Sequence, residues 1–214
     1  MNRTIYTLVR GVSWRFAVAL IILCVGASAH ATTTIDFESL SNGTVVTNQF
    51  AGQGITFSSA GGEVMLVTTQ ASYQSTPPNF LCTGSAAGGI DCVGTVIFDF
   101  ATPVNGLQFD AVGNQNSIGT SFAQADIYQN GILTVSNLGL LVSLGNFLPD
   151  HQDLSAYSNI TQVVIHNNTD PAGTGYDTVS FTQSQASVPE PATMLLLGTG
   201  IVGLAAARRR KKQS

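Results

Sequence analysis

Apolar and polar residues alternate along several short stretches in the middle of this 214-residue chain. The stretches TVIFDF (95–100), GLQFDAV (106–112), TQVVIHN (161–167) and YDTVSFT (176–182) all follow this pattern. Because successive side chains of a β-strand point to opposite faces, each stretch predicts a strand with one apolar face. The apolar positions are Val96, Phe98, Phe100, Leu107, Phe109, Ala111, Val163, Ile165, Val179 and Phe181.

Clusters of Gly, Asn and Ser separate these stretches at short intervals, as in SNG, AGQG, SAGG and QNG. These residues favour turns, and no part of the region shows a sustained helical period. Short alternating strands with frequent turns are typical of an all-β sandwich or barrel. We therefore predict that residues 32–187 form one all-β domain, which is long enough to bury a core.

The first 31 residues have the organisation of an export signal. Arg3, Arg10 and Arg15 precede the apolar stretch FAVALIILCVG, and AHA (29–31) then places small residues where a signal peptidase requires them. Cleavage after Ala31 is the main expectation, and an uncleaved anchor helix is the alternative. Cys24 does not suit a lipoprotein, because Leu23 precedes it in place of a small residue.

Residues 192–207 form a second apolar run, which is followed by five consecutive basic residues (208–212). A helix of this length reaches about 24 Å, slightly less than a hydrocarbon core of about 30 Å. We predict a short transmembrane helix, with the basic tail on the cytoplasmic side and the domain outside the inner membrane.

The C-terminus resembles the tripartite sorting signal of PEP-CTERM proteins. Pro189, Glu190 and Pro191 form the triplet, and the apolar run and the basic cluster of residues 188–214 follow it in the same order. The resemblance implies an exosortase as partner, transient anchoring in the inner membrane, and delivery to the cell surface or the extracellular matrix of a bacterium that makes exopolysaccharide. It implies nothing about the chemistry of the domain, because sorting signals occur on many folds.

The domain has an unusual charge, because residues 32–187 contain eleven acidic residues and no Lys or Arg. Its formal charge is therefore about −11, although the whole chain carries −4. Nucleic acid and anionic membranes are poor partners for such a surface, whereas cations are good ones.

Cys82 and Cys92 are the only cysteines left once the signal is removed, and they bracket the Gly-rich stretch TGSAAGGID. Two neighbouring cysteines in an exported domain predict a disulfide. A metal site would require further ligands, and no second Cys pair or nearby His supplies them.

The opening stretch TTIDFESLSNGTVVTNQFAGQGITFSS and the closing strand DTVSF resemble the first and last strands of exported bacterial jelly-roll domains. The resemblance implies a jelly-roll-like β-sandwich in which these two strands pair. In carbohydrate-binding relatives, acidic residues of both strands hold a structural calcium. This would place calcium on Glu38 and Asp177, with Asp36 as a further ligand.

Catalytic motifs are missing from the sequence of the domain. His151 and His166 have no metal-ligand spacing, there is no G-x-S-x-G elbow, and no cation can stabilise an oxyanion. We expect His151 to lie in a loop between Asp150 and Asp153, and His166 to point outward from a strand. The oxygen-rich stretches PDHQD and NNTDPAGTGYD contain further ligand types that suit calcium.

The sequence therefore predicts an exported structural or adhesive protein associated with exopolysaccharide, and not an enzyme. The alternative is a jelly-roll lectin or glycoside-active enzyme, which a cleft with two carboxylates and a Tyr would favour. The only Trp, Trp14, leaves with the signal. The candidate platforms for sugar stacking are Tyr73, Tyr128, Tyr157 and Tyr176.

Overall fold

The structure is a computed structural model that describes residues 31–70, 78–85, 87, 89–113, 117–144 and 148–184. These residues form strands and one short 3₁₀ turn, so the prediction of an all-β domain is confirmed. The elements are β1 (Thr32–Ile35), β2 (Val45–Val46), η1 (Ala51–Gln53), β3 (Ile55–Ser59), β4 (Val64–Thr69), β5 (Asn79–Gly84), β6 (Val96–Val112), β7 (Ser121–Gln129), β8 (Ile132–Leu141), β9 (Asp150–Asp153), β10 (Ile160–His166) and β11 (Gly175–Gln183).

Among the described residues, no helix combines the length and the apolar character that a membrane span requires. The predicted signal peptide (1–31) lies outside the described residues except for Ala31, and the predicted sorting segment (188–214), with its transmembrane helix, lies wholly outside them. The boundaries of these segments stay predictions.

Hydrogen bonds join all eleven strands into one sheet with the main order β2-β4-β5-β11-β6-β10-β7-β8. Strands β1, β3 and β9 pair with this path from the side, and all the pairings are antiparallel. The jelly-roll-like sandwich stays a prediction, because the hydrogen bonds do not divide the strands into two separate sheets.

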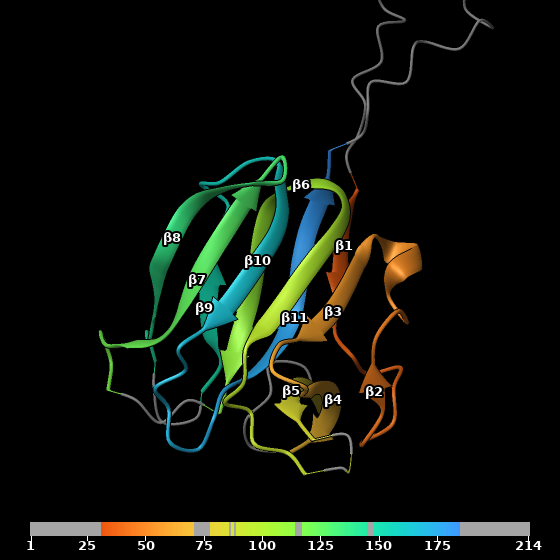
Figure 1. The fold of residues 1–214 in the computed structure, drawn as a ribbon, viewed down its shortest axis with the longest axis vertical. Helices are drawn as coiled ribbons and strands as arrows, with labels where there is room; N and C mark the ends of the chain where they lie inside the picture. Colours follow the sequence, from red (N-terminus) through yellow and green to blue (C-terminus); the bar gives the residue numbers. More distant parts are fainter. Residues whose placement is uncertain are drawn as a thin grey trace, which may run out of the picture. The chain divides into compact units, whose positions relative to one another are not determined.

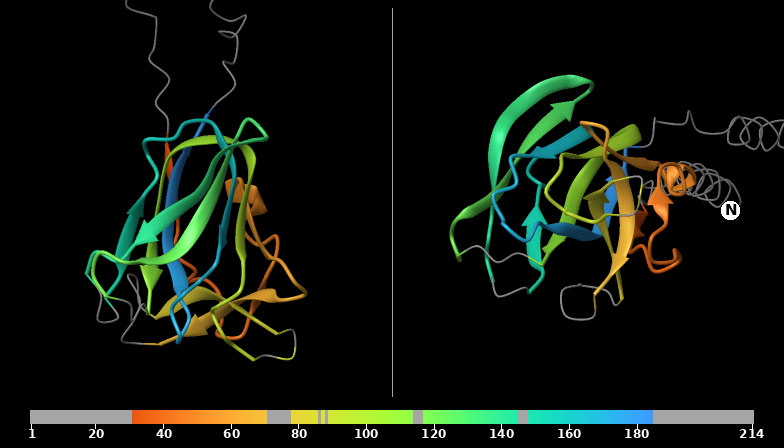
Figure 2. Two further views of the ribbon diagram at one scale, coloured as in Figure 1. Left: turned by 60° about the vertical axis from the view of Figure 1, so that its left-hand side comes forward. Right: turned by 60° about the horizontal axis from the view of Figure 1, so that its bottom comes forward.

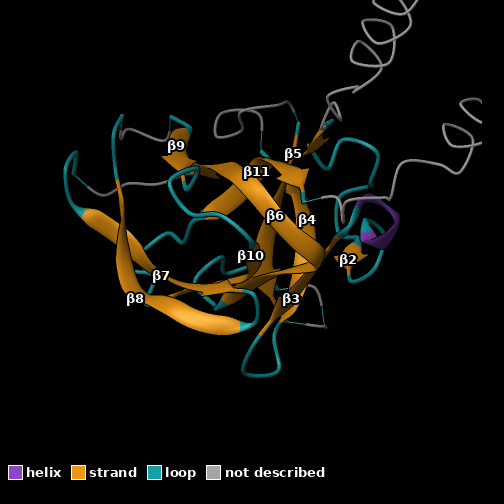
Figure 3. Cartoon of the chain, turned by 90° about the horizontal axis from the view of Figure 1, so that it is seen from above, coloured by secondary structure: helices purple, strands orange, loops and turns teal. Residues whose placement is uncertain are grey.

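The 17-residue strand β6 connects two groups of strands. Its residues 96–100 lie between β3 and β10, whereas its residues 108–111 lie between β9 and β11. Figure 3 shows β5, β9 and β11 on one side and β3, β7, β8 and β10 on the other, with β6 running between them.

The inward-facing positions of β6 change phase in the middle of the strand. Val96, Phe98 and Phe100 are buried in the first half, whereas Leu107 and Phe109 are buried in the second. The buried positions are even-numbered in the first half and odd-numbered in the second, so regular alternation is interrupted between them. Gly106 lies at this interruption and has φ of +62°, a conformation that glycine adopts at little cost. The sequence pattern suggested two separate strands here, but the structure has one strand with an irregularity.

The first and last strands pair as the sequence predicted, with Thr32 opposite Thr182 and Ile35 opposite Val179. The domain therefore begins and ends at the same end of the sheet. Figures 1 and 2 show the start of β1 and the end of β11 side by side, with β4 and β5 at the opposite end.

Aromatic side chains dominate the core. The ring of Phe98, which is fully buried, makes edge contacts with Phe57, Phe109 and Tyr176 at centroid distances of 5.2, 5.6 and 6.2 Å. These rings come from β3, both halves of β6, and β11, so they join the two groups of strands. The apolar positions that the alternation placed on inner faces are all buried.

We predict that Phe98→Ala lowers the free energy of unfolding by about 3–5 kcal/mol, because it leaves a cavity among three other rings. Ile132→Ala is the control, since Ile132 is 68% exposed on β8, and it should change stability by less than about 0.5 kcal/mol. Urea unfolding measures both effects, and equal losses would contradict the central role of Phe98.

Candidate functional site

Strand β5 is buried along its whole length, because it packs on both faces. Leu81 points into the main core, whereas Phe80 and Cys82 form a second small apolar cluster with Val112 and the partly buried Cys92. This second cluster is separate from the main core. It shows that another part of the chain covers the outer face of β5.

The predicted disulfide between Cys82 and Cys92 is confirmed, with a Cα–Cα distance of 4.7 Å. It fastens residues 89–92 to β5. The hydroxyl of Thr83 adds two contacts, since it donates to Asp91 Oδ1 (3.1 Å) and accepts the N–H of Gly94 (2.9 Å). The disulfide and these bonds fix Ile90 and Asp91 beside the second cluster.

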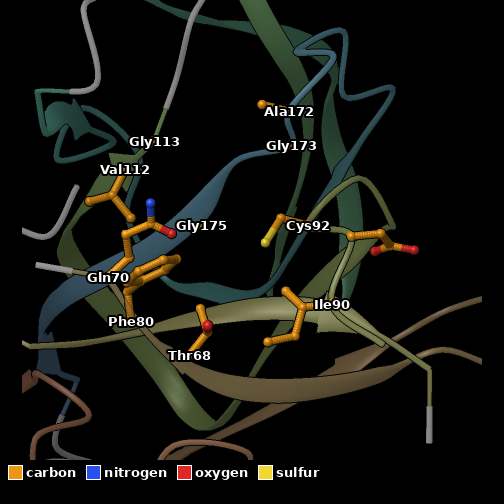
Figure 4. A pocket seen from close by; sticks show the side chains of 11 residues that line it. Thr68, Gln70, Phe80, Ile90, Cys92, Val112, Gly113, Ala172, Gly173 and Gly175 are labelled. Atoms are coloured by element: carbon orange, nitrogen blue, oxygen red, sulfur yellow. The ribbon is translucent and has the colours of Figure 1, made fainter. Parts of the chain in front are cut away.

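A pocket of about 170 Å³ lies over this cluster. Its floor and walls come from β4, β5, the end of β6, the segment that the disulfide fastens, and the start of β11. Figure 4 shows the Gln70 amide and the Thr68 hydroxyl among the side chains around it, on either side of the ring of Phe80. The lining residues are Thr68, Gln70, Phe80, Ile90, Asp91, Cys92, Val112, Gly113, Ala172, Gly173 and Gly175.

Two glycines make this arrangement possible by close approach. A Cβ at Gly175 would lie 2.3 Å from the ring of Phe80, so only glycine lets the ring rest on the backbone of β11. A Cβ at Gly173, which has φ of +81°, would lie 2.3 Å from the carbonyl oxygen of Asp91. Both positions bring the start of β11 against the disulfide-linked segment.

The predicted calcium ligands occupy neighbouring elements but have other contacts. Glu38 accepts the backbone N–H of Asn79 through Oε1 (2.8 Å), and Asp36 accepts the N–H of Glu38 (3.2 Å). Asp177 is fully buried, and its Oδ1 accepts the N–H of Thr178 (2.7 Å). Asp36 directly follows Ile35, and Asp177 stands two residues before Val179, the partner of Ile35, so both carboxylates belong to the same end of the β1–β11 pair.

The carboxylate of Glu38 is turned toward the start of β5, where Asn79 also donates to the carbonyl oxygen of Leu40 (2.8 Å). Within the part of the chain that the structure describes, no three or more His, Cys, Asp or Glu side chains are grouped as a metal site. The three residues thus do not form a three-carboxylate site in this structure, and calcium binding stays a prediction.

The two histidines of the domain each face an aspartate. His166 Nε2 lies 3.3 Å from Asp126 Oδ1, and both side chains are about one-fifth exposed (20% and 22%). His151 Nδ1 lies 2.9 Å from Asp110 Oδ1. The expectation that His151 lies in a loop was wrong, because β9 pairs with β6 and places His151 directly opposite Asp110.

Asp126 connects three strands. Its Oδ1 accepts the N–H of Asn137 on β8 (2.8 Å) and faces His166 on β10. Burial acts to raise the pKa of Asp126, but the Asn137 hydrogen bond and the His166 contact outweigh it and lower the pKa. Because the pKa of Asp126 is lower in the folded than in the unfolded state, ionised Asp126 stabilises the fold. This stabilisation is present above the unfolded pKa and is lost as the pH falls through the folded pKa.

The candidate stacking residues are placed differently from one another. Tyr176 is 1% exposed, and burial raises its pKa, so it belongs to the core and is not a platform. Tyr128 and Tyr157 are partly exposed, and Tyr73 lies outside the described residues. None of the four is among the described lining of the pocket.

The sequence reasoning missed the pocket residues Thr68, Gln70 and Phe80. One signal was available, because NFLCTG (79–84) is apolar at adjacent positions, a pattern typical of a strand buried on both faces. That signal could have indicated an additional layer over β5. It could not have indicated Gln70, whose position depends on pairing between distant strands.

Comparisons with known proteins identify the C-terminal segment. Residues 187–211 match the PEP-CTERM protein-sorting motif, which contains Pro189, Glu190 and Pro191. Among solved structures, the K2 cleaved adhesin domain of Lys-gingipain is similar at a TM-score of 0.45 and 15% identity, covering 72% of this chain and 100% of that domain. No curated protein matches the chain.

We predict that replacing both cysteines by alanine lowers the free energy of unfolding by about 2.5–3 kcal/mol, because the closed loop is lost from the unfolded chain. Thiol labelling of the denatured, unreduced wild type should find no free thiol in the exported protein. Two labelled cysteines per mature chain would contradict the bond.

We predict that Glu38→Ala lowers the melting temperature in every buffer, because it leaves the N–H of Asn79 without its acceptor. In chelator, Glu38→Gln should stay near the wild type, since an amide oxygen still accepts this hydrogen bond. The two variants are compared in calcium, in chelator, and in sodium chloride of equal ionic strength.

The same melts test the calcium prediction. Specific binding stabilises the wild type by about 2.7 kcal/mol at a hundredfold excess of calcium over its dissociation constant, and Glu38→Gln should lose that increment. An equal response to sodium and calcium in the wild type would show that there is only diffuse screening.

Proposed function

We propose that this chain, which carries a PEP-CTERM sorting signal and is thereby marked as an exported, surface-sorted substrate of an exosortase, has a structural or adhesive role. In this proposal it works at the cell surface or in the extracellular matrix, in association with exopolysaccharide. The observation that carries it is the sorting motif at 187–211, placed directly after a disulfide-bonded β domain.

The charge of the domain supports a partner that is not acidic. Eleven acidic residues stand in residues 32–187 without any Lys or Arg. An acidic polymer or an anionic membrane surface would be repelled, whereas neutral polysaccharide would not. Association with neutral exopolysaccharide is therefore favoured by the electrostatics of the domain.

Three finer features belong to the same proposal. The two groups of strands that β6 connects act as the two layers of a jelly-roll-like sandwich, with the aromatic core between them. The apolar run 192–207 acts as a transmembrane helix that anchors the protein in the inner membrane until the exosortase acts. Calcium bound by Glu38, Asp177 and Asp36 would add a clamp between the first and last strands.

A binding or structural role is favoured over glycoside hydrolysis. Hydrolysis requires a pair of carboxyl groups about 5–9.5 Å apart on either side of the scissile bond. Among the described residues that line the pocket, Asp91 is the single carboxylate. We therefore propose that the domain is not an enzyme, and a lectin of the same fold is the second candidate function.

The experiment compares cells with and without the exosortase and follows the location and the mass of the protein. We predict that Glu190→Ala gives a membrane-bound form with the full tail, because Glu190 stands between two prolines that keep the backbone extended and accessible. Wild-type protein should leave the membrane and lose mass at its C-terminus.

Glu63→Ala is the matched control, because it removes the same side chain from the β domain and should be sorted like the wild type. Loss of the exosortase should reproduce the effect of Glu190→Ala in cells that carry the wild-type chain. Identical location and mass in all four samples would overturn the sorting proposal.

A further inference from the structure

The pocket over β5 lies at the end of the domain where β11 begins. Strand β11 begins at Gly175, which lines the pocket, and ends at Gln183 beside the start of β1. A strand of this length spans about 27 Å at about 3.4 Å per residue. Figure 1 shows β4 and β5 near the start of β11, and the sorting motif follows the end of β11 in the sequence.

The lining of the pocket combines an apolar floor with a polar rim. Phe80 and Val112 form the floor, and Thr68 and Gln70 bring a hydroxyl and an amide to it from β4 and the residue after β4 (Figure 4). Thr68 lies directly opposite Phe80 in the β4–β5 pair. Gln70 is exposed and Thr68 is partly buried, and both line the pocket, so a ligand can reach both groups.

The size of the pocket restricts the ligand to a single ring. Its volume of about 170 Å³ is slightly above the cavity of about 150 Å³ that holds benzene and far below pockets for drug-sized ligands, which reach about 300–1,000 Å³. A small ring with polar edges suits this pocket, because the side chains of its floor are almost fully buried and its rim carries hydrogen-bonding groups.

The charge of the pocket restricts the ligand further. Among the described residues that line the pocket, Asp91 is acidic and none is basic. The domain as a whole has no Lys or Arg. An acidic ring would bring a second negative charge into this field without a counter-ion. A neutral ring has no such cost, and its hydroxyls can both donate to and accept from the Gln70 amide.

We propose that this pocket binds one neutral pyranose ring of a sugar, with its hydroxyls on Gln70 and Thr68 at the rim. The inference deepens the proposed surface function by naming the ligand class. Its test uses purified protein, so a failure here leaves the sorting experiment unaffected, and a failure of sorting leaves this test unaffected.

The full-length protein, purified in detergent, is run through native gels that contain dextran, a β-1,3-glucan, mannan, galactan or alginate, or no polysaccharide. We expect at least one neutral polysaccharide to slow the wild type, and alginate, a polymer of acidic sugars, not to do so. An excess of the matching free monosaccharide should restore the mobility, because one sugar ring fills the pocket and competes with the polymer for it.

Gln70→Ala and Thr68→Val should each raise the apparent dissociation constant for the polysaccharide about fivefold to tenfold. This is the effect of losing one hydrogen bond to an uncharged ligand. Gln53→Ala is the matched control, because Gln53 is an exposed glutamine in η1, at the opposite end of the domain. Unchanged melting temperatures show that the variants are folded.

Three results would overturn the inference. The first is that no neutral polysaccharide retards the wild type, and the second is that alginate retards it as strongly as the neutral polymers do. The third is that Gln70→Ala and Thr68→Val bind like the wild type, because sugar would then be bound elsewhere on the protein.

Discussion

The long strand β6 is the element on which the other strands of the domain depend. Its first half lies between β3 and β10, and its second half lies between β9 and β11. Both halves must point their apolar side chains into the same core, although they pair with different strands. The change of phase near Gly106 reconciles these two demands, because one irregularity shifts the inward face by one residue. Without it, Leu107 and Phe109 would face away from the rings that Phe98 contacts.

Because the domain has no Lys or Arg, its acidic side chains are stabilised by other groups. In most domains Lys and Arg pair with carboxylates, but here the backbone and histidine replace them. Buried Asp150 accepts the N–H groups of Ser143 and Leu144 through Oδ1 (2.8 and 2.6 Å), and Glu38 and Asp126 accept those of Asn79 and Asn137. Backbone N–H groups stabilise a carboxylate without adding a charge. The domain therefore remains strongly acidic after folding, and this restricts its partners.

Much of the fold could be predicted from the sequence, because alternation is a local property. The positions assigned to inner faces are buried. The first and last strands pair, as their resemblance to the first and last strands of jelly-roll domains implied. The continuity of β6 could not be predicted, since Pro103 and Gly106 also suit a turn. His151 and Asp110 are 41 residues apart, so their pairing depends on the register of β9 against β6. The pocket was missed for the same reason, because strand pairing and a disulfide bring its lining together.

The disulfide relates the pocket to the compartment in which the protein works. Ile90 and Asp91 form one wall of the pocket, and Cys92, which follows them directly, is bonded to Cys82 on β5. Disulfides form outside the cytoplasm, where thiols are not kept reduced. The wall is therefore fixed only once the domain has been exported. At the opposite end, β11 is held by β1 and β6 up to the residues that precede the sorting motif. The pocket therefore lies at the start of β11, whereas the sorting motif follows the end of this strand in the sequence.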